Sequence, residues 1–260
     1  ENGTPENAQE ITAGRAQYRD ENGATFPACG VVDGDGTDEL VIGLGSGGDG
    51  LIQFFEDQGG ALAPIRTTLG NGYVQWNDRR YSRYHGGARP SLGDIDGDGR
   101  DEIVMGPHRA KRAWVTILDD ARSGFDRYPG LSRAGQLYMH TDGISGRAAV
   151  MPAVGDFDGD GLAEIVVGTN QPESKMFIRD DATTAFQIPY GIGAEGVISG
   201  TQGIPAPRGI EPGCGDVTGN GVDEIIVDSR GSGIGWLSQD GKRLDTFIAG
   251  PGAAPAVSIR

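Results

Sequence analysis

Acidic side chains alternate in a short glycine-rich loop of this 260-residue chain. Asp156, Asp158 and Asp160 occupy every second position, a glycine follows, and Glu164 closes the pattern. Alternating side chains of a tight loop can all turn inward, and the backbone carbonyl of Leu162 can add another oxygen. A flexible set of many oxygen ligands suits Ca²⁺ better than Mg²⁺. We therefore predict a calcium site in this loop.

Three further loops carry the same pattern to different degrees. The second is as complete as the third, with Asp94, Asp96, Asp98, Glu102 and the carbonyl of Arg100. The fourth keeps its oxygen donors but has lost two charges, with Asp216, Thr218, Asn220, Glu224 and the carbonyl of Val222. The first has Val31 where the first Asp is expected, leaving Asp33, Asp35 and Glu39. We expect two full sites, a weaker fourth and an incomplete first, hence two to four Ca²⁺ ions.

Electrostatic repulsion favours an ion in these loops. Two carboxylates about 4 Å apart repel by roughly 4 kcal/mol at an effective dielectric of 20, so four acids together need a cation or protons. An EF-hand loop is excluded, because its closing Glu stands at the twelfth position and helices flank it. Here the closing Glu is the ninth residue and an apolar, strand-like run follows. The alternative is a plain Asp/Gly turn without metal.

The loops belong to a repeat of about 60 residues. Aligned segments begin at Pro27, Pro90, Pro152 and Pro212, and each runs through the acidic loop into an apolar stretch. Short runs rich in β-branched and aromatic residues, bounded by Gly, Asp and Pro, indicate strands, and no stretch has a helical period. Each unit offers four strands, the last of them expected at 61–65, 125–128, 185–188 and 244–248.

Repeated four-stranded units predict an all-β fold, a closed β-propeller of four blades. The alternatives are two stacked sheets, or an open arc of four blades completed by a partner. The expected divisions are an N-terminal arm (1–10), repeats at 11–66, 67–130, 131–191 and 192–250, and a C-terminal tail (251–260). Cys29 and Cys214 share one repeat position, so a closed ring predicts a disulfide between them and an oxidising compartment. Two buried free thiols are the alternative.

Composition narrows the possible functions. The net charge of −15 excludes nucleic-acid binding through the general field of the protein. The sequence has no apolar run long enough to span a membrane. It carries no Gly-x-Ser-x-Gly nucleophile motif, no Cys/His pair at a catalytic spacing and no phosphate-binding glycine loop. We therefore expect no enzyme activity.

The loops, with the Pro-x-x-Gly before them and Glu-Ile-Val-x-Gly after them, resemble the FG-GAP repeats of integrin α-subunit propellers. They are equally similar to the related VCBS-type repeats of secreted bacterial proteins and to some fungal propeller lectins. The resemblance covers all four units and implies Ca²⁺ between the first two strands of a blade and an extracellular or cell-surface location. Family members include adhesion receptors, lectins and domains attached to enzymes, so the fold does not settle function.

Aromatic and Arg side chains gather in the connector before the second motif. These residue types are favoured interface anchors, and flat aromatic rings also suit sugar stacking; ordinary packing is the alternative. The connector residues are Tyr73, Trp76, Arg79, Arg80, Tyr81, Arg83 and Tyr84, and Tyr138 and His140 stand at a comparable place before the third motif.

Two functions from different classes follow. The first is a calcium-dependent adhesion or lectin-like module that recognises a glycan or a cell-surface protein. The second is a structural subunit that assembles with copies of itself, head to tail, in an extracellular fibre or surface layer. An accessory domain of a secreted hydrolase is a third alternative.

Overall fold

The protein is described from a computed structural model that covers residues 24–67, 69–75, 86–108, 110, 112–131, 135–139, 148–170, 175–187, 209–229, 233–237 and 244–248. Sixteen β-strands and no helix occur in these residues, which confirms the all-β prediction. No helix in this part of the chain is long and apolar enough to cross a membrane. The predicted arm (1–10) and tail (251–260) lie outside the described residues.

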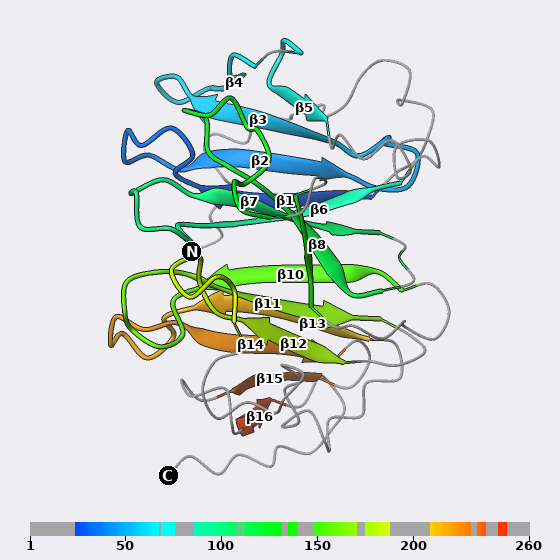
Figure 1. The fold of residues 1–260 in the computed structure, drawn as a ribbon, viewed down its shortest axis with the longest axis vertical. Helices are drawn as coiled ribbons and strands as arrows, with labels where there is room; N and C mark the ends of the chain where they lie inside the picture. Colours follow the sequence, from blue (N-terminus) through cyan, green and yellow to red (C-terminus); the bar gives the residue numbers. More distant parts are fainter. Residues whose placement is uncertain are drawn as a thin grey trace, which may run out of the picture.

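The strands form four antiparallel sheets, one for each repeat (Figure 1). The first contains β1 (Thr25–Gly30), β2 (Glu39–Leu44), β3 (Leu51–Asp57), β4 (Leu62–Pro64) and β5 (Tyr73–Gln75). The second contains β6 (Ala88–Gly93), β7 (Glu102–Pro107), β8 (Trp114–Leu118) and β9 (Gln136–Tyr138). The third contains β10 (Val150–Gly155), β11 (Glu164–Thr169) and β12 (Met176–Arg179), and the fourth β13 (Ile210–Gly215), β14 (Glu224–Ser229), β15 (Gly233–Leu237) and β16 (Leu244–Ile248).

The outer strands differ from the prediction in the second and third sheets. Strands β4 and β16 lie within the predicted runs, but Phe125 and Phe186 stand in turns with φ of 61° and 58°. Both rings are buried. The sequence runs 125–128 and 185–188 therefore look strand-like because each contains an apolar turn residue that packs into the core. The fourth strand of the second sheet is instead β9, from the following connector, and β5 takes the matching place in the first sheet.

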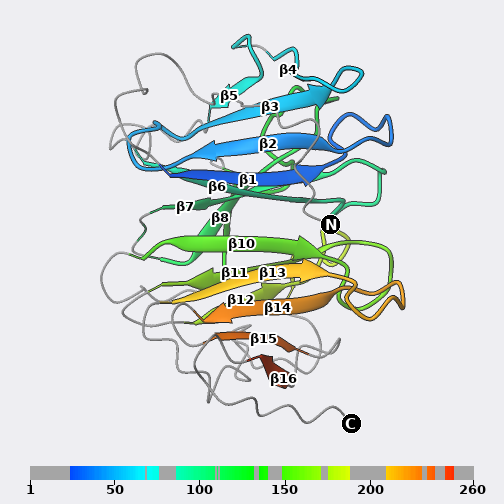
Figure 2. The same ribbon diagram turned by 180° about the vertical axis from the view of Figure 1, so that it is seen from behind.

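Consecutive sheets pack through buried apolar side chains. One cluster joins the first and second sheets, including Phe54 and Met105, and another joins the second and third, including Ile117 and Val167. A third cluster joins the third and fourth sheets and includes Ile178 and Ile225. The first strand of each sheet contacts the first strand of the next, in the order β1, β6, β10, β13. Figure 2 shows the four sheets arranged one after another along the long axis of the molecule.

A closed ring is not confirmed. Among the described residues, no apolar cluster joins the fourth sheet to the first. On β1, Thr25, Pro27 and Cys29 are exposed, whereas the equivalent β6 residues Ala88 and Pro90 are buried against the preceding sheet. This face of β1 is therefore bare of a preceding sheet, and its Pro27 and Cys29 line a cavity that Pro212 and Cys214 of β13 also line.

The predicted disulfide is absent. Cys29 is an exposed free thiol and Cys214 a half-buried one. Cys214 packs against the third sheet, where a Cβ added at Gly155 would lie 2.8 Å from its Cβ. Since the first and fourth sheets do not pack on each other through a shared core, their equivalent positions are not held as neighbours.

Candidate metal centre

The four acidic loops are the turns that join the first two strands of each sheet, and they lie along one edge of the molecule (Figure 1). The second, third and fourth loops each wind around their first Asp, which accepts backbone hydrogen bonds from later residues of the loop. In the third loop, Asp156 accepts hydrogen bonds from the backbone N–H groups of Gly159 (2.6 Å) and Gly161 (3.0 Å). These two glycines have φ of 82° and 90°, a conformation that favours residues without a Cβ. The glycines of the motif therefore allow the bend that gathers the acids.

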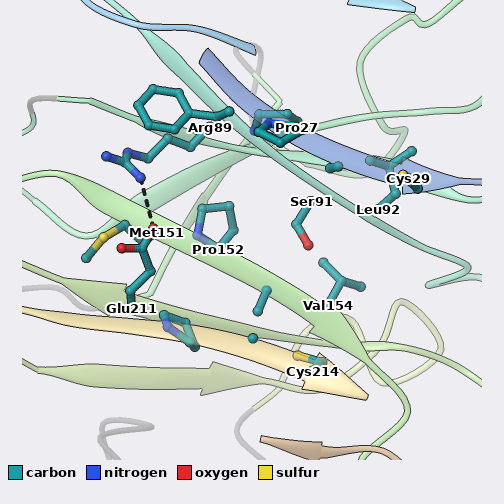
Figure 3. A pocket seen from close by; sticks show the side chains of 16 residues that line it. Pro27, Cys29, Arg89, Ser91, Leu92, Met151, Pro152, Val154, Glu211 and Cys214 are labelled. Atoms are coloured by element: carbon teal, nitrogen blue, oxygen red, sulfur yellow. Dashed lines mark hydrogen bonds and ion pairs between the residues drawn. The ribbon is translucent and has the colours of Figure 1, made fainter. Parts of the chain in front are cut away.

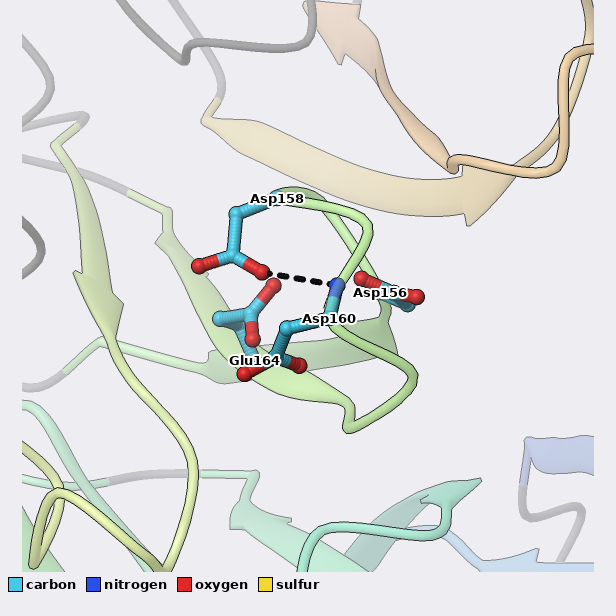
Figure 4. A group of neighbouring side chains, drawn as sticks. All are labelled: Asp156, Asp158, Asp160 and Glu164. Carbon is cyan, nitrogen blue, oxygen red and sulfur yellow. Dashed lines mark hydrogen bonds between the residues drawn. The ribbon is translucent and has the colours of Figure 1, made fainter.

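The third loop brings its four predicted acids together. One carboxylate oxygen from each of Asp156, Asp158, Asp160 and Glu164 lies within 4.8 Å of the others (Figure 4). The N–H of Asp160 donates to Asp158 (3.2 Å) and the N–H of Leu162 donates to Asp160 (2.9 Å). These bonds hold the carboxylates in place, while the carbonyls of Arg100, Leu162 and Val222 stay predicted ligands.

The closing glutamates are buried and half-satisfied. In the first three loops, Oε2 of Glu39, Glu102 or Glu164 accepts from the backbone N–H of the second loop residue, at 2.8, 2.9 and 2.6 Å. The other oxygen, Oε1, is buried in all three and has no hydrogen-bond partner. A buried carboxylate oxygen without a partner is costly, and a bound cation would satisfy it.

Burial also changes how these glutamates ionise. Desolvation raises the pKa of Glu102 and of Glu164 to about 9, and neighbouring aspartates add to the effect against one backbone hydrogen bond. The same cause raises the pKa of Glu39 to about 7. Without an ion, Glu102 and Glu164 therefore hold a proton at neutral pH. The oxygen-only donor set and the unpartnered buried oxygens fit a hard divalent cation such as Ca²⁺.

The second loop is less complete than the third, although the sequence predicts them to be equal. Asp94, Asp96 and Glu102 come together, but Asp98 pairs with the guanidinium of Arg100 at 3.5 Å. The hydroxyl of Tyr128 donates to Asp96 at 3.2 Å. A side chain of the loop itself thus competes with an ion for one predicted ligand.

The fourth loop satisfies its own glutamate. The hydroxyl of Thr218 donates to Oε1 of Glu224 at 2.8 Å, and the N–H of Val217 donates to Oε2 at 2.9 Å. Asn220 accepts from the N–H of Val222 at 2.9 Å. The hydroxyl stands where the other loops leave an oxygen bare, which gives a physical reason for the weaker binding predicted from the lost charges.

The first loop gathers a different set of acids from the predicted one. Asp33 and Asp35 come together with Glu56 at the end of β3. The N–H of Val31, at the position of the missing first Asp, donates to Asp101 of the second sheet at 2.9 Å, as the N–H of Asp156 donates to Asp223 of the fourth sheet at 3.2 Å. The role of Glu56 was missed, although an acid recurs after the third strand of the first three repeats and was a visible signal.

The connector residues fall into three groups. Tyr73 is buried with Leu44 and Leu51, so it is a core residue and no surface anchor. Tyr138 on β9 is 43% exposed. Trp76, Arg79, Arg80, Tyr81, Arg83, Tyr84 and His140 lie outside the described residues.

The first strands of all four sheets line a cavity of about 400 Å³ (Figure 3). Within it, Arg89 of β6 pairs with Glu211 of β13 at 3.2 Å. The Arg89 guanidinium also lies 3.8 Å above the ring of Phe26 on β1. These three side chains come from equivalent positions of different repeats, and sequence reasoning did not single them out.

Comparison with known proteins supports the repeat assignment. Residues 152–173 match the family model of the FG-GAP repeat, which confirms the predicted resemblance at the third loop. No curated protein matches the sequence with significance. Similar solved structures include an exotype rhamnogalacturonan lyase (14% identity, TM-score 0.40) and a rhamnogalacturonan lyase of Bacillus licheniformis (17% identity, TM-score 0.40). Each similarity covers 85% of this chain and only 40% or 41% of the lyase chain.

Proposed function

We propose that this chain is an extracellular calcium-binding module that recognises a glycan or a cell-surface protein and catalyses no reaction. The observation that carries the calcium site is the buried, unpartnered Oε1 atom that recurs in Glu39, Glu102 and Glu164. The FG-GAP match over the third loop supports the same assignment and the extracellular location.

The ions would act as ties between consecutive sheets. In the first three loops, the carbonyl of the first residue accepts a backbone hydrogen bond from the next sheet: Val31 from Asp101 (2.8 Å), Asp94 from Ala163 (2.9 Å) and Asp156 from Asp223 (2.7 Å). An ion that fixes Asp94 or Asp156 also fixes the point where the neighbouring sheet is attached. Calcium would thereby hold the sheets in register, together with the connectors that they carry.

The recognition surface is proposed on the connectors that end in the outer strands. Tyr138 is a large exposed side chain on such a strand, and its hydroxyl donates to Gln136 at 3.0 Å. This bond fixes the side chain in an orientation suited to stacking or to an interface. Binding would then depend on calcium indirectly, through the position of the strand.

Calcium removal tests this proposal. Two sites at a hundredfold excess of ligand each contribute about 2.7 kcal/mol, so we expect the Tm to fall by roughly 10 °C or more in EDTA. Metal analysis of purified protein should find at least two Ca²⁺ ions per chain. A metal-free protein whose Tm does not change in EDTA would rule out the calcium site.

Recognition is tested by a glycan and cell-binding screen with and without Ca²⁺. A polysaccharide cleavage assay that gives product would overturn the non-catalytic assignment.

The second candidate, a subunit that assembles with copies of itself, is favoured by the bare face of β1. Thr25, Pro27 and Cys29 are exposed where equivalent residues pack against a preceding sheet. We infer that the arc is open and that a partner blade covers this face. Electron microscopy of native material separates the candidates, because polymers support assembly and dispersed single particles support the recognition module.

A further inference from the structure

A second acidic cluster lies beside the third loop. Strand β12 ends at Arg179, and Asp180 and Asp181 follow it. One carboxylate oxygen from each of Glu164, Asp180 and Asp181 lies within 4.8 Å of the others. Glu164 thus belongs both to this cluster and to the loop.

Asp181 is the unusual member of this cluster, because its side chain is fully buried. Its Oδ1 accepts hydrogen bonds from the Thr183 N–H (2.6 Å), the Thr183 hydroxyl (2.6 Å) and the Thr184 N–H (3.2 Å). Its Oδ2 is buried without a hydrogen-bond partner, as is Oε1 of Glu164. Two bare carboxylate oxygens in one buried cluster call for a positive charge.

The second sheet supplies that charge from its own chain. Asp120 is the equivalent of Asp181, and its Oδ2 lies 3.6 Å from Nε of Arg100. Leu162 takes the position of Arg100 in the third loop. Both side chains pack on the preceding loop, since a Cβ added at Gly34 would lie 2.7 Å from Arg100 and one at Gly97 would lie 2.8 Å from Leu162. The third sheet therefore has the buried carboxylate but not the guanidinium.

We propose that Glu164, Asp180 and Asp181 bind a second Ca²⁺ ion next to the ion of the third loop, with Glu164 shared between the two. Six carboxylates meet here, namely Asp156, Asp158, Asp160, Glu164, Asp180 and Asp181. One divalent ion leaves a net charge of −4 among them, and two leave −2. The inference rests on the proposed loop ion, and the second ion supplies the charge that Arg100 supplies in the second sheet.

Counting bound ions tests the second site. We expect Asp181→Asn and Leu162→Arg each to bind one Ca²⁺ fewer than the wild type, measured by equilibrium dialysis with radioactive calcium at saturating concentration. The new guanidinium of Leu162→Arg replaces the ion, so this variant should also lose less Tm in EDTA than the wild type does. Asp120→Asn is the matched control and should keep the wild-type count, because Arg100 already stands beside that position.

The outcomes separate the two sites. If Leu162→Arg and Asp181→Asn both keep the wild-type count and show only weaker binding, Asp180 and Asp181 are further ligands of a single ion and the inference is overturned. Asp160→Asn removes a predicted ligand of the loop ion and leaves the cluster of Glu164, Asp180 and Asp181 unchanged. A lower count in Asp160→Asn with an unchanged count in Asp181→Asn leaves the proposed function standing without the second site. Unchanged binding in all three variants would remove both.

Discussion

The closing glutamates decide what each loop can do. Glu102 and Glu164 are almost completely buried, and each has one oxygen bonded to the backbone and one oxygen bare. In the fourth loop, the Thr218 hydroxyl donates to the Glu224 oxygen that is left without a partner in the other loops. Thr218 stands at the position of Asp96 and Asp158, so a single side chain separates a loop whose glutamate is satisfied within the chain from loops whose glutamate keeps an unpartnered oxygen.

Calcium binding should be coupled to proton release at these glutamates. Burial raises the pKa of Glu102 and of Glu164 to about 9, so both carry a proton below that pH when no ion is bound. Calcium needs the ionised form, and its affinity should rise with pH up to about 9, by up to roughly tenfold per unit for each proton released. Calorimetry in buffers of different ionisation enthalpy measures this release. An affinity that stays constant from about pH 6 to about pH 9 would contradict this coupling.

At the scale of strands, the glycine that ends the Glu-Ile-Val-x-Gly motif sets the distance between sheets. A Cβ added at Gly43, Gly106 or Gly168 would lie 2.2 Å from a backbone carbonyl oxygen of the next sheet's first strand. The position is thus reserved for glycine by packing of one strand on another, and not by a positive φ.

Gly168→Ala should therefore destabilise the protein. The new Cβ meets the carbonyl oxygen of Ile210, and overpacking of this kind costs about 1–3 kcal/mol. Urea denaturation followed by circular dichroism gives the change. Gly213→Ala is the control, because a Cβ there meets nothing within 4 Å. Equal losses in both variants would show that the close approach of the strands is unimportant.

At the scale of the whole molecule, the fourth repeat departs from the others where a ring would close. Asp228 stands at the position of Gly43, Gly106 and Gly168, and it is exposed. A first strand packed on the fourth sheet in the same way would collide with its side chain. The presence of Asp228 in place of this glycine explains why the bare face of β1 does not pack on the fourth sheet.

Thiol reactivity follows from this arrangement. Cys29 is exposed, and partial burial and the charge of Asp38 raise the pKa of its thiol. Deeper burial raises the pKa of the Cys214 thiol further, helped by the charges of Asp223 and Glu164. A thiol reagent should modify Cys29 first and Cys214 at least about tenfold more slowly. Cys29→Ser and Cys214→Ser assign the two phases. If the denatured, unreduced protein shows no free thiol, the two cysteines form a disulfide and the open arrangement is wrong.

The sequence alone determined the four-fold repeat, the all-β fold class and the position of the acidic loops. These properties depend on local spacing: alternating carboxylates, glycines at the bends and short apolar runs act within a few residues of one another. The first two strands of every sheet and the loop between them follow from such patterns.

Only the tertiary structure decided which carboxylates meet and how the sheets are completed. Glu56 joins the first loop, Arg100 competes for Asp98, and β5 and β9 come from connectors. Each of these is a contact between segments distant in the chain or a choice between packing partners. Such contacts depend on the shape of the neighbouring surface, which spacing along a single repeat does not specify.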